Sequence, residues 1–111
     1  MKAILVTAVA FAISVAGPVA LATGNAESGK AKAAQVCAAC HGPDGNKPTG
    51  PEFPVLAGQH ADYLKRALAD YKSGKRNNPI MKGFAATLSN KEMDDLSAWF
   101  ASQPSNLVTH R

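Results

Sequence analysis

Two cysteines and a histidine stand close together in the sequence Cys37-Ala-Ala-Cys40-His41. Thiols at this spacing can be presented together by one turn of helix, and each can add to a vinyl group of a porphyrin to form a thioether bond. The imidazole that follows directly can bind the iron of the same porphyrin. The spacing therefore predicts one covalent haem of the c type, attached through Cys37 and Cys40, with His41 as an axial iron ligand.

Three other uses of a Cys-x-x-Cys pair suit this chain less well. A thioredoxin-like redox pair needs a βαβ context, and no strand-like alternation surrounds Cys37. A zinc site needs a second pair of ligands at metal spacing, but the chain has only 2 cysteines. A disulfide between Cys37 and Cys40 would close a very small loop and stabilise little. Haem attachment is therefore the leading interpretation of the motif.

The sixth iron ligand is a separate question. A thioether opposite histidine keeps the coordination constant while the iron changes charge, and it raises the reduction potential. Met1 belongs to residues 1–22, which are expected to be cleaved off as a signal peptide. Met93 is expected to have a packing role at the start of a helix that begins after Ser89. Met81 lies in a region expected to be irregular, 40 residues after His41. We therefore favour Met81, with an open site or one filled by His60 as the alternatives.

Residues 42–58 contain four glycines and four prolines, a density that predicts a loop. Directly after the haem motif, this loop is expected to cover the proximal side. A ligating imidazole donates its other ring N–H to an acceptor that fixes its orientation, and the carbonyl of Pro51 is our candidate acceptor. Arg76 is a candidate for pairing with a haem propionate, because a guanidinium group suits carboxylates.

Helical patterns flank this loop. Good helix formers and a possible N-cap at Asn25 predict a first helix over residues 26–40. Apolar residues at helical spacing predict a second helix over residues 59–73, ended by Gly74. The Asn77-Asn78-Pro79 stretch marks a turn, so residues 75–88 are expected to be irregular.

The last helix has a clear start. Ser89 and Glu92 form a capping box, and Leu88 with Met93 fits a hydrophobic staple. Pro104 ends this helix. The expected fold class is therefore all-α, with three main helices and long loops wrapped around one covalent haem.

The first 22 residues have the composition of a secretory signal peptide. Lys2 provides a positive charge, residues 3–15 are apolar, and Ala20-Leu21-Ala22 fits the small-x-small cleavage rule. We expect cleavage after Ala22, which leaves a domain of residues 23–111 in the periplasm. An uncleaved membrane anchor is the alternative, because the apolar stretch is almost long enough to span a bilayer.

The formal net charge of +4 is modest, and aromatic residues are not interleaved with the basic ones, so nucleic-acid binding is not indicated. Four basic residues nevertheless fall in one run that contains no acidic residue. They are Lys72, Lys75, Arg76 and Lys82. We expect this basic rim to face a redox partner with an acidic surface, with an ordinary solvated face as the alternative.

Several stretches together resemble the small class I bacterial cytochromes c, and most closely the cytochrome c4 and c-553 group. The matching stretches are Cys37-Ala-Ala-Cys-His41-Gly42 followed by Asp44-Gly45, residues 53–59, Tyr63-Leu64, and residues 70–76 leading to Met81. The resemblance implies the class I cytochrome c fold, with His41 and Met81 as axial ligands. It also implies a crossing of the first and last helices, where Gly29 meets Leu96 and Trp99. Cytochrome c4 proper has two such domains, whereas this chain has one haem motif.

These observations indicate a periplasmic mono-haem electron carrier between respiratory redox partners, a monomer or weak oligomer, and not an enzyme. One alternative is a cytochrome subunit of a larger oxidoreductase. Another is a haem enzyme or sensor with an open sixth site. That class needs distal acid–base groups, and only His60 and His110 remain after His41.

Overall fold

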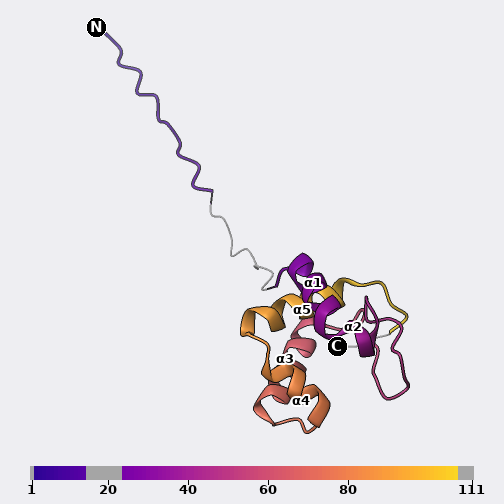
Figure 1. Cartoon of the computed structure of the whole chain (residues 1–111). Helices are drawn as coiled ribbons and strands as arrows, with labels where there is room; N and C mark the ends of the chain where they lie inside the picture. Colours follow the sequence, from indigo (N-terminus) through magenta and orange to yellow (C-terminus); the bar gives the residue numbers. More distant parts are fainter. Residues whose placement is uncertain (1, 15–23, 108–111) are drawn as a thin grey trace.

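Helices provide all the regular secondary structure in residues 2–14 and 24–107, the part of the chain that the computed structural model describes (Figure 1). In chain order they are α1 (Ala26–Val36), α2 (Ala38–His41), α3 (Ala61–Ser73), α4 (Pro79–Ala86) and α5 (Asn90–Ser102). The expected all-α class is confirmed, and α1, α3 and α5 are the three expected main helices.

The crossing of α1 and α5 leaves no room for a side chain at Gly29. A Cβ atom at this position would lie 2.0 Å from the carbonyl oxygen of Asp95 and 2.9 Å from the Cβ of Trp99. Glycine costs about 1 kcal/mol relative to alanine inside a helix, and here it permits the two backbones to approach. The expected contact with Trp99 is confirmed, although the backbone of Asp95, rather than Leu96, is the nearest neighbour.

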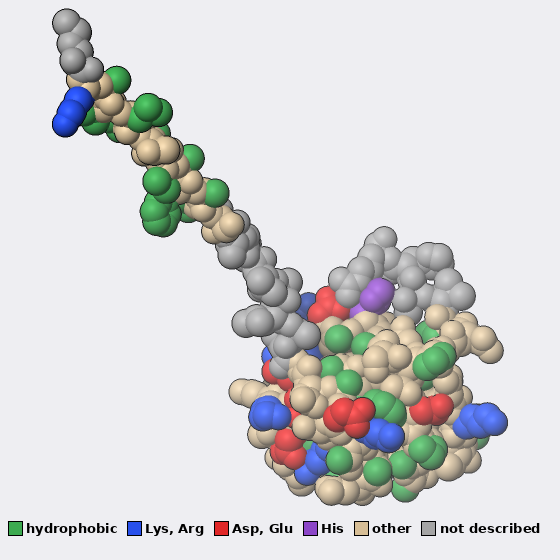
Figure 2. All heavy atoms as spheres, turned by 90° about the horizontal axis from the view of Figure 1, so that it is seen from above, with side chains coloured by type: hydrophobic (Ala, Val, Ile, Leu, Met, Phe, Trp, Pro, Cys, Tyr) green, Lys and Arg blue, Asp and Glu red, His purple; other side chains and the backbone are tan. Residues whose placement is uncertain are grey.

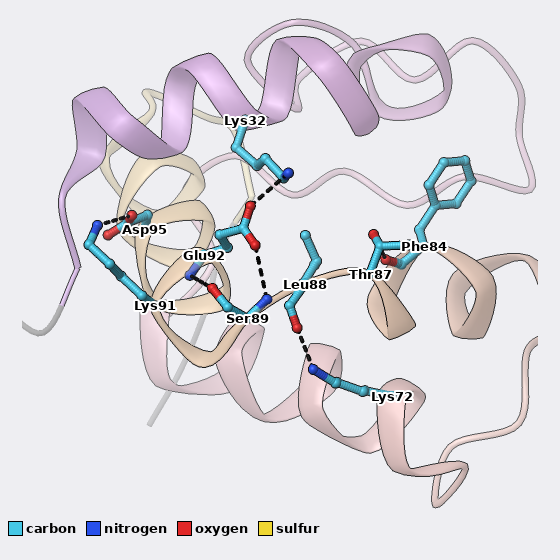
Figure 3. A network of polar contacts seen from close by, with 9 residues as sticks. All are labelled: Lys32, Lys72, Phe84, Thr87, Leu88, Ser89, Lys91, Glu92 and Asp95. Carbon is cyan, nitrogen blue, oxygen red and sulfur yellow. Dashed lines mark hydrogen bonds and ion pairs between the residues drawn. The ribbon is translucent and has the colours of Figure 1, made fainter.

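The start of α5 has the expected caps. The Ser89 hydroxyl accepts a hydrogen bond from the Glu92 N–H at 3.1 Å, and the Glu92 carboxylate accepts one from the Ser89 N–H at 3.0 Å (Figure 3). Leu88 and Met93 are each only 2% exposed, as the hydrophobic staple predicts. Together with other buried side chains they form the core. Its members are Ala33, Leu64, Leu88, Met93, Leu96 and Phe100.

The prediction that residues 75–88 are irregular is wrong, because they contain α4. The Asn78 side chain caps this helix, and Pro79 occupies its first turn. Proline is favoured there because its missing N–H falls among the donors that have no partner inside the helix, and its fixed φ is already helical. The Asn-Pro pair is therefore a helix start in this chain and not a turn.

Two predicted boundaries also shift. The expected helix over residues 26–40 is interrupted at Cys37, which separates α1 from the four-residue α2. The second predicted helix begins two residues late, with His60 as its N-cap, and it ends as expected at Gly74 in the left-handed conformation.

Residues 2–14 have no regular secondary structure and stand clear of the domain (Figure 2). Their large apolar side chains are exposed, including Ile4, Leu5 and Phe11. In the described ranges no helix has the length and apolar character needed to cross a membrane. The expected cleavage site after Ala22 lies outside the described residues, so the signal peptide stays a prediction.

Candidate haem site

A cavity of about 630 Å³ opens between α2, the loop of residues 42–58, α3 and α4. Cys37, Cys40, His41 and Met81 all contribute to its lining, although Met81 is far from the others in the sequence. Much of the remaining lining is apolar, with Leu and Phe side chains prominent. The volume falls within the range of about 300–1,000 Å³ that is typical of small-molecule and cofactor sites.

The break between α1 and α2 positions the two thiols. Cys37 ends α1 and caps α2, and its carbonyl oxygen accepts the His41 N–H at 3.0 Å. Both cysteines are free thiols and partly buried, so the structure contains no Cys37–Cys40 disulfide. Burial raises the pKa of the Cys37 thiol to about 11, which keeps it protonated near neutral pH.

His41 is 7% exposed, and its Nδ1 atom lies 3.0 Å from the carbonyl oxygen of Pro54. A carbonyl oxygen can only accept, so Nδ1 carries a proton, and in the neutral imidazole Nε2 then has the lone pair. The Phe53 ring stands edge-on to the imidazole, with centroids 6.1 Å apart. These contacts fix the ring and leave Nε2 as the nitrogen that can bind a metal.

Pro51 was therefore the wrong choice of acceptor. The Phe53 N–H donates to the Gly50 carbonyl at 3.2 Å, so the chain turns back at Pro51 and Glu52. This turn delivers the carbonyl of Pro54, three residues later, to the imidazole. Pro51 still contributes to the lining of the cavity.

The loop of residues 42–58 is held at several points despite its lack of helix. Thr49 donates its N–H to the Cys40 carbonyl at 2.9 Å and its hydroxyl to the Ala39 carbonyl at 3.1 Å. At the far end of the loop, the Gly58 N–H donates to the Phe100 carbonyl at 2.9 Å. The loop is thus tied to α2 and to α5. No feature of the sequence had singled out Thr49.

The three candidates for the sixth ligand have different surroundings. Met81 is half-buried in the first turn of α4, beside the cavity. Met93 belongs to the core and does not line the cavity. His60 caps α3 and is also absent from the lining, while His110 lies outside the described residues. Of the described side chains among these, the cavity brings only that of Met81 together with His41.

The basic rim is not a set of four equivalent charges. The Lys72 ammonium donates to the Leu88 carbonyl (Figure 3). The Arg76 guanidinium lies 4.7 Å from the centroid of the Tyr71 ring, and both residues line the cavity. Lys75 and Lys82 are exposed, and a Cβ at Gly74 would lie 3.5 Å from the Lys82 nitrogen. The exposed positive charge therefore gathers at the turn between α3 and α4.

No group of three or more His, Cys, Asp or Glu side chains capable of holding a metal occurs within residues 2–14 and 24–107. An all-helical domain in which one cavity gathers a thiol pair, an imidazole and a thioether has the donor set of a haem protein of the c type.

Comparison with known proteins leads to the same class. The family model for cytochrome c matches residues 26–104. Cytochrome c4 of Pseudomonas aeruginosa is 51% identical over 82 residues, which cover 74% of this chain and 40% of that protein. Cytochrome c-554(548) of Halomonas halodenitrificans is 37% identical over 83 residues, covering 72% of this chain and 98% of that protein. The crystal structure of reduced recombinant cytochrome c4 from Pseudomonas stutzeri matches with a TM-score of 0.69 and 41% identity, over 76% of this chain and 48% of that one.

The chain belongs to the cytochrome c family, whose members carry haem c and its iron bound covalently. It has the class I cytochrome c fold. The chain spans less than half the length of the cytochrome c4 relatives, but nearly the whole length of cytochrome c-554(548).

Proposed function

We propose that this protein is a periplasmic mono-haem cytochrome that carries single electrons between respiratory redox partners. The observation that carries the proposal is the one cavity lined by Cys37, Cys40, His41 and Met81. Cys37 and Cys40 would hold the haem through thioether bonds, and His41 Nε2 and the Met81 sulfur would bind the iron. When bound, the haem supplies an iron that accepts and releases one electron.

The residues present fit this group. The cavity is large, and its lining is mainly apolar, which suits a porphyrin. The hydrogen bond from His41 Nδ1 to Pro54 leaves Nε2 available as a ligand. Arg76 stands at the cavity with its guanidinium stacked on Tyr71, where it can pair with a propionate. A filled sixth position favours electron transfer over catalysis, because a substrate would have no open site on the iron.

A second candidate function is that of a dedicated acceptor or subunit of a dehydrogenase. Two relatives favour it by name. The "Thiosulfate dehydrogenase electron acceptor" of Stutzerimonas stutzeri is 44% identical over 78 residues, and this chain covers 36% of it. The "Cytochrome subunit of sulfide dehydrogenase" of Chlorobaculum tepidum is 32% identical over 66 residues, and this chain covers 58% of it. Both candidates require the same haem site and differ in the lifetime of the complex with the donor.

The partner is proposed to dock over Lys75, Arg76 and Lys82 with an acidic surface. Ile80 and Phe84 of helix α4 are partly exposed and line the cavity, so apolar contact at the edge of the cavity would accompany charge attraction. Lys72 contributes less than the sequence indicated, because its ammonium is bound to the Leu88 carbonyl.

Mass spectrometry and absorption spectra test the haem assignment. The mature protein should carry one haem that survives acid-acetone extraction, and loss of haem under that treatment would rule out thioether attachment. Met81→Ala should keep the haem but lose the sulfur-to-iron charge-transfer band of the oxidised protein. Met93→Ala is the matched control, because it removes a buried core side chain and should lower stability by about 2–5 kcal/mol while leaving the band intact. A Met81→Ala variant that retained the band would exclude Met81 as the ligand.

A further inference from the structure

Helix α4, which carries Met81, buries few of its side chains in the protein core. Ala85 is its single buried residue. Ile80 and Phe84 are 58% and 43% exposed, and together with Met81 they line the cavity that the haem is proposed to fill. It has only 8 residues, and helices this short are not stable in isolation. Apart from the haem, the position of Met81 therefore depends on the contact of α4 with α3 and on how the two ends of α4 are held.

The C-terminal end is tied to its surroundings (Figure 3). The Thr87 hydroxyl donates to the Phe84 carbonyl at 2.7 Å, which satisfies an acceptor in the last turn. The Lys72 ammonium on α3 binds the carbonyl of Leu88, and the Leu88 side chain is buried in the core. This end is therefore held to α3 and to the core.

The N-terminal end is held by the side chain of Asn78. Its Oδ1 atom accepts the N–H of Ile80 at 3.1 Å and the N–H of Met81 itself at 3.1 Å. Asn78 also lines the cavity. One side-chain oxygen thus accepts a hydrogen bond from the backbone of the proposed ligand itself, in the first turn of α4.

We propose that Asn78 is a positioning residue for Met81, and that its side-chain cap sets how often the sulfur leaves the iron. This inference rests on the proposed role of Met81 as the sixth ligand. Loss of the cap should release the first turn of α4 while α1, α3 and α5 remain packed. Opening of this kind is a local event, distinct from unfolding of the domain.

Imidazole binding to the oxidised holoprotein measures this opening, because imidazole can reach the iron only after the sulfur has left. At saturating imidazole the rate approaches the rate of sulfur dissociation. Replacing an Asn N-cap by Ala typically lowers the equilibrium constant for forming the capped helix by a factor of about 2 to 30. We expect Asn78→Ala to raise the limiting rate by about that factor. Asn78→Ser should restore a rate close to that of the parent protein, because serine is an equally good cap and adds no charge.

Ser89→Ala is the matched control. It removes the same kind of cap from α5, so it should lower the denaturant midpoint without raising the imidazole rate. A parallel increase for Ser89→Ala and Asn78→Ala would mean that imidazole enters through general unfolding, and it would overturn the inference.

The sulfur-to-iron charge-transfer band distinguishes failure of the positioning role of Asn78 from failure of Met81 as the sixth ligand. If the parent protein shows the band and Asn78→Ala leaves the imidazole rate unchanged, the positioning role is wrong and the ligand assignment stands. If the parent protein lacks the band, Met81 is not the ligand and both are overturned.

Discussion

Gly29 and Gly83 are both glycines inside helices, but their surroundings are opposite. A Cβ at Gly29 would lie 2.0 Å from the Asp95 carbonyl oxygen, whereas a Cβ at Gly83 would have no neighbour within 4 Å. Gly29→Ala should therefore destabilise the holoprotein by about 3 kcal/mol through overpacking. Gly83→Ala should stabilise it by about 0.5–1 kcal/mol, because alanine is the better helix former.

Unfolding in guanidinium chloride, monitored by circular dichroism, measures both changes in stability. The opposite signs of the two substitutions provide the internal control. Equal changes in the two variants would show that helix propensity alone, and not the α1–α5 contact, determines the cost at Gly29.

For individual residues, the sequence predicts which side chains can bind the haem better than it predicts the contacts that hold those side chains in place. Cys37, Cys40 and His41 are adjacent, so their spacing alone indicates haem attachment. The acceptor for His41 could not be chosen in the same way. Residues 42–58 offer several backbone carbonyls after the motif, and which of them meets Nδ1 depends on the turn from Gly50 to Phe53. That turn selects Pro54 over Pro51.

Helix α5 is the element that ties the domain together through charge. Three carboxylates on it form ion pairs of 2.6–2.7 Å with lysines of α1, α3 and α5 itself. The pairs are Lys32–Glu92, Lys65–Asp94 and Lys91–Asp95. Asp95 also accepts the N–H of Asn25 at 2.8 Å, which holds the start of α1 against α5.

These contacts make stability depend on pH. The hydrogen bond from Lys32 lowers the pKa of Glu92 from 4.5 to about 2, and the bond from Lys91, followed by that from Asn25, lowers the pKa of Asp95. The unfolded chain therefore binds these protons more readily than the native one. The contribution to the free energy of unfolding should be complete above about pH 4.5 and should be lost as the pH falls towards about 2.

Urea midpoints measured between pH 7 and pH 2 test this dependence. Glu92→Gln removes one of the lowered carboxyl groups, so its midpoint should fall less steeply with acid than that of the parent protein. Identical slopes for the two proteins would mean that other groups determine the acid sensitivity.

Among the helices, the sequence predicts the long helices α1, α3 and α5, but it does not predict the short helices α2 and α4 as separate elements. The box at Ser89 and the glycine at position 74 act within one turn, so the sequence displays them directly. Helix α4 was missed because Asn-Pro suits both a turn and a helix start. The surrounding structure decides between them, since α4 must span the distance from α3 to the fixed Leu88.

For the whole molecule, the testable consequence concerns partner docking. Lys75 lies at the α3–α4 turn, and Lys30 lies on α1 at the other end of the domain, 5.6 Å from the centroid of the Trp99 ring (Figure 1). Lys75→Glu and Lys30→Glu change the net charge equally. If the partner docks near the cavity, Lys75→Glu should slow bimolecular electron transfer several-fold at low salt, and Lys30→Glu should have a much smaller effect.

Stopped-flow rates with a purified acidic redox partner, measured over a range of ionic strength, provide the test. The difference between the variants should shrink at high salt, because screening acts over about 8–10 Å at physiological ionic strength. Equal slowing by both substitutions would indicate that net charge alone steers the encounter and would reject the local docking surface. The absorption spectrum should be unchanged in both variants.

The internal pairing on α5 has an electrical consequence. Glu92, Asp94 and Asp95 form ion pairs with nearby lysines. Positive and negative side chains therefore lie next to one another around α5 (Figure 2). Among the residues that the structure describes, Lys75 and Lys82 near the turn between α3 and α4 form no ion pair of this kind. Exposed positive charge on Lys75 and Lys82 therefore lies beside the cavity, whereas the carboxylates of α5 are paired. On a negatively charged electrode the domain should adsorb with α4 towards the surface, and reversing the sign of the surface should slow interfacial electron exchange.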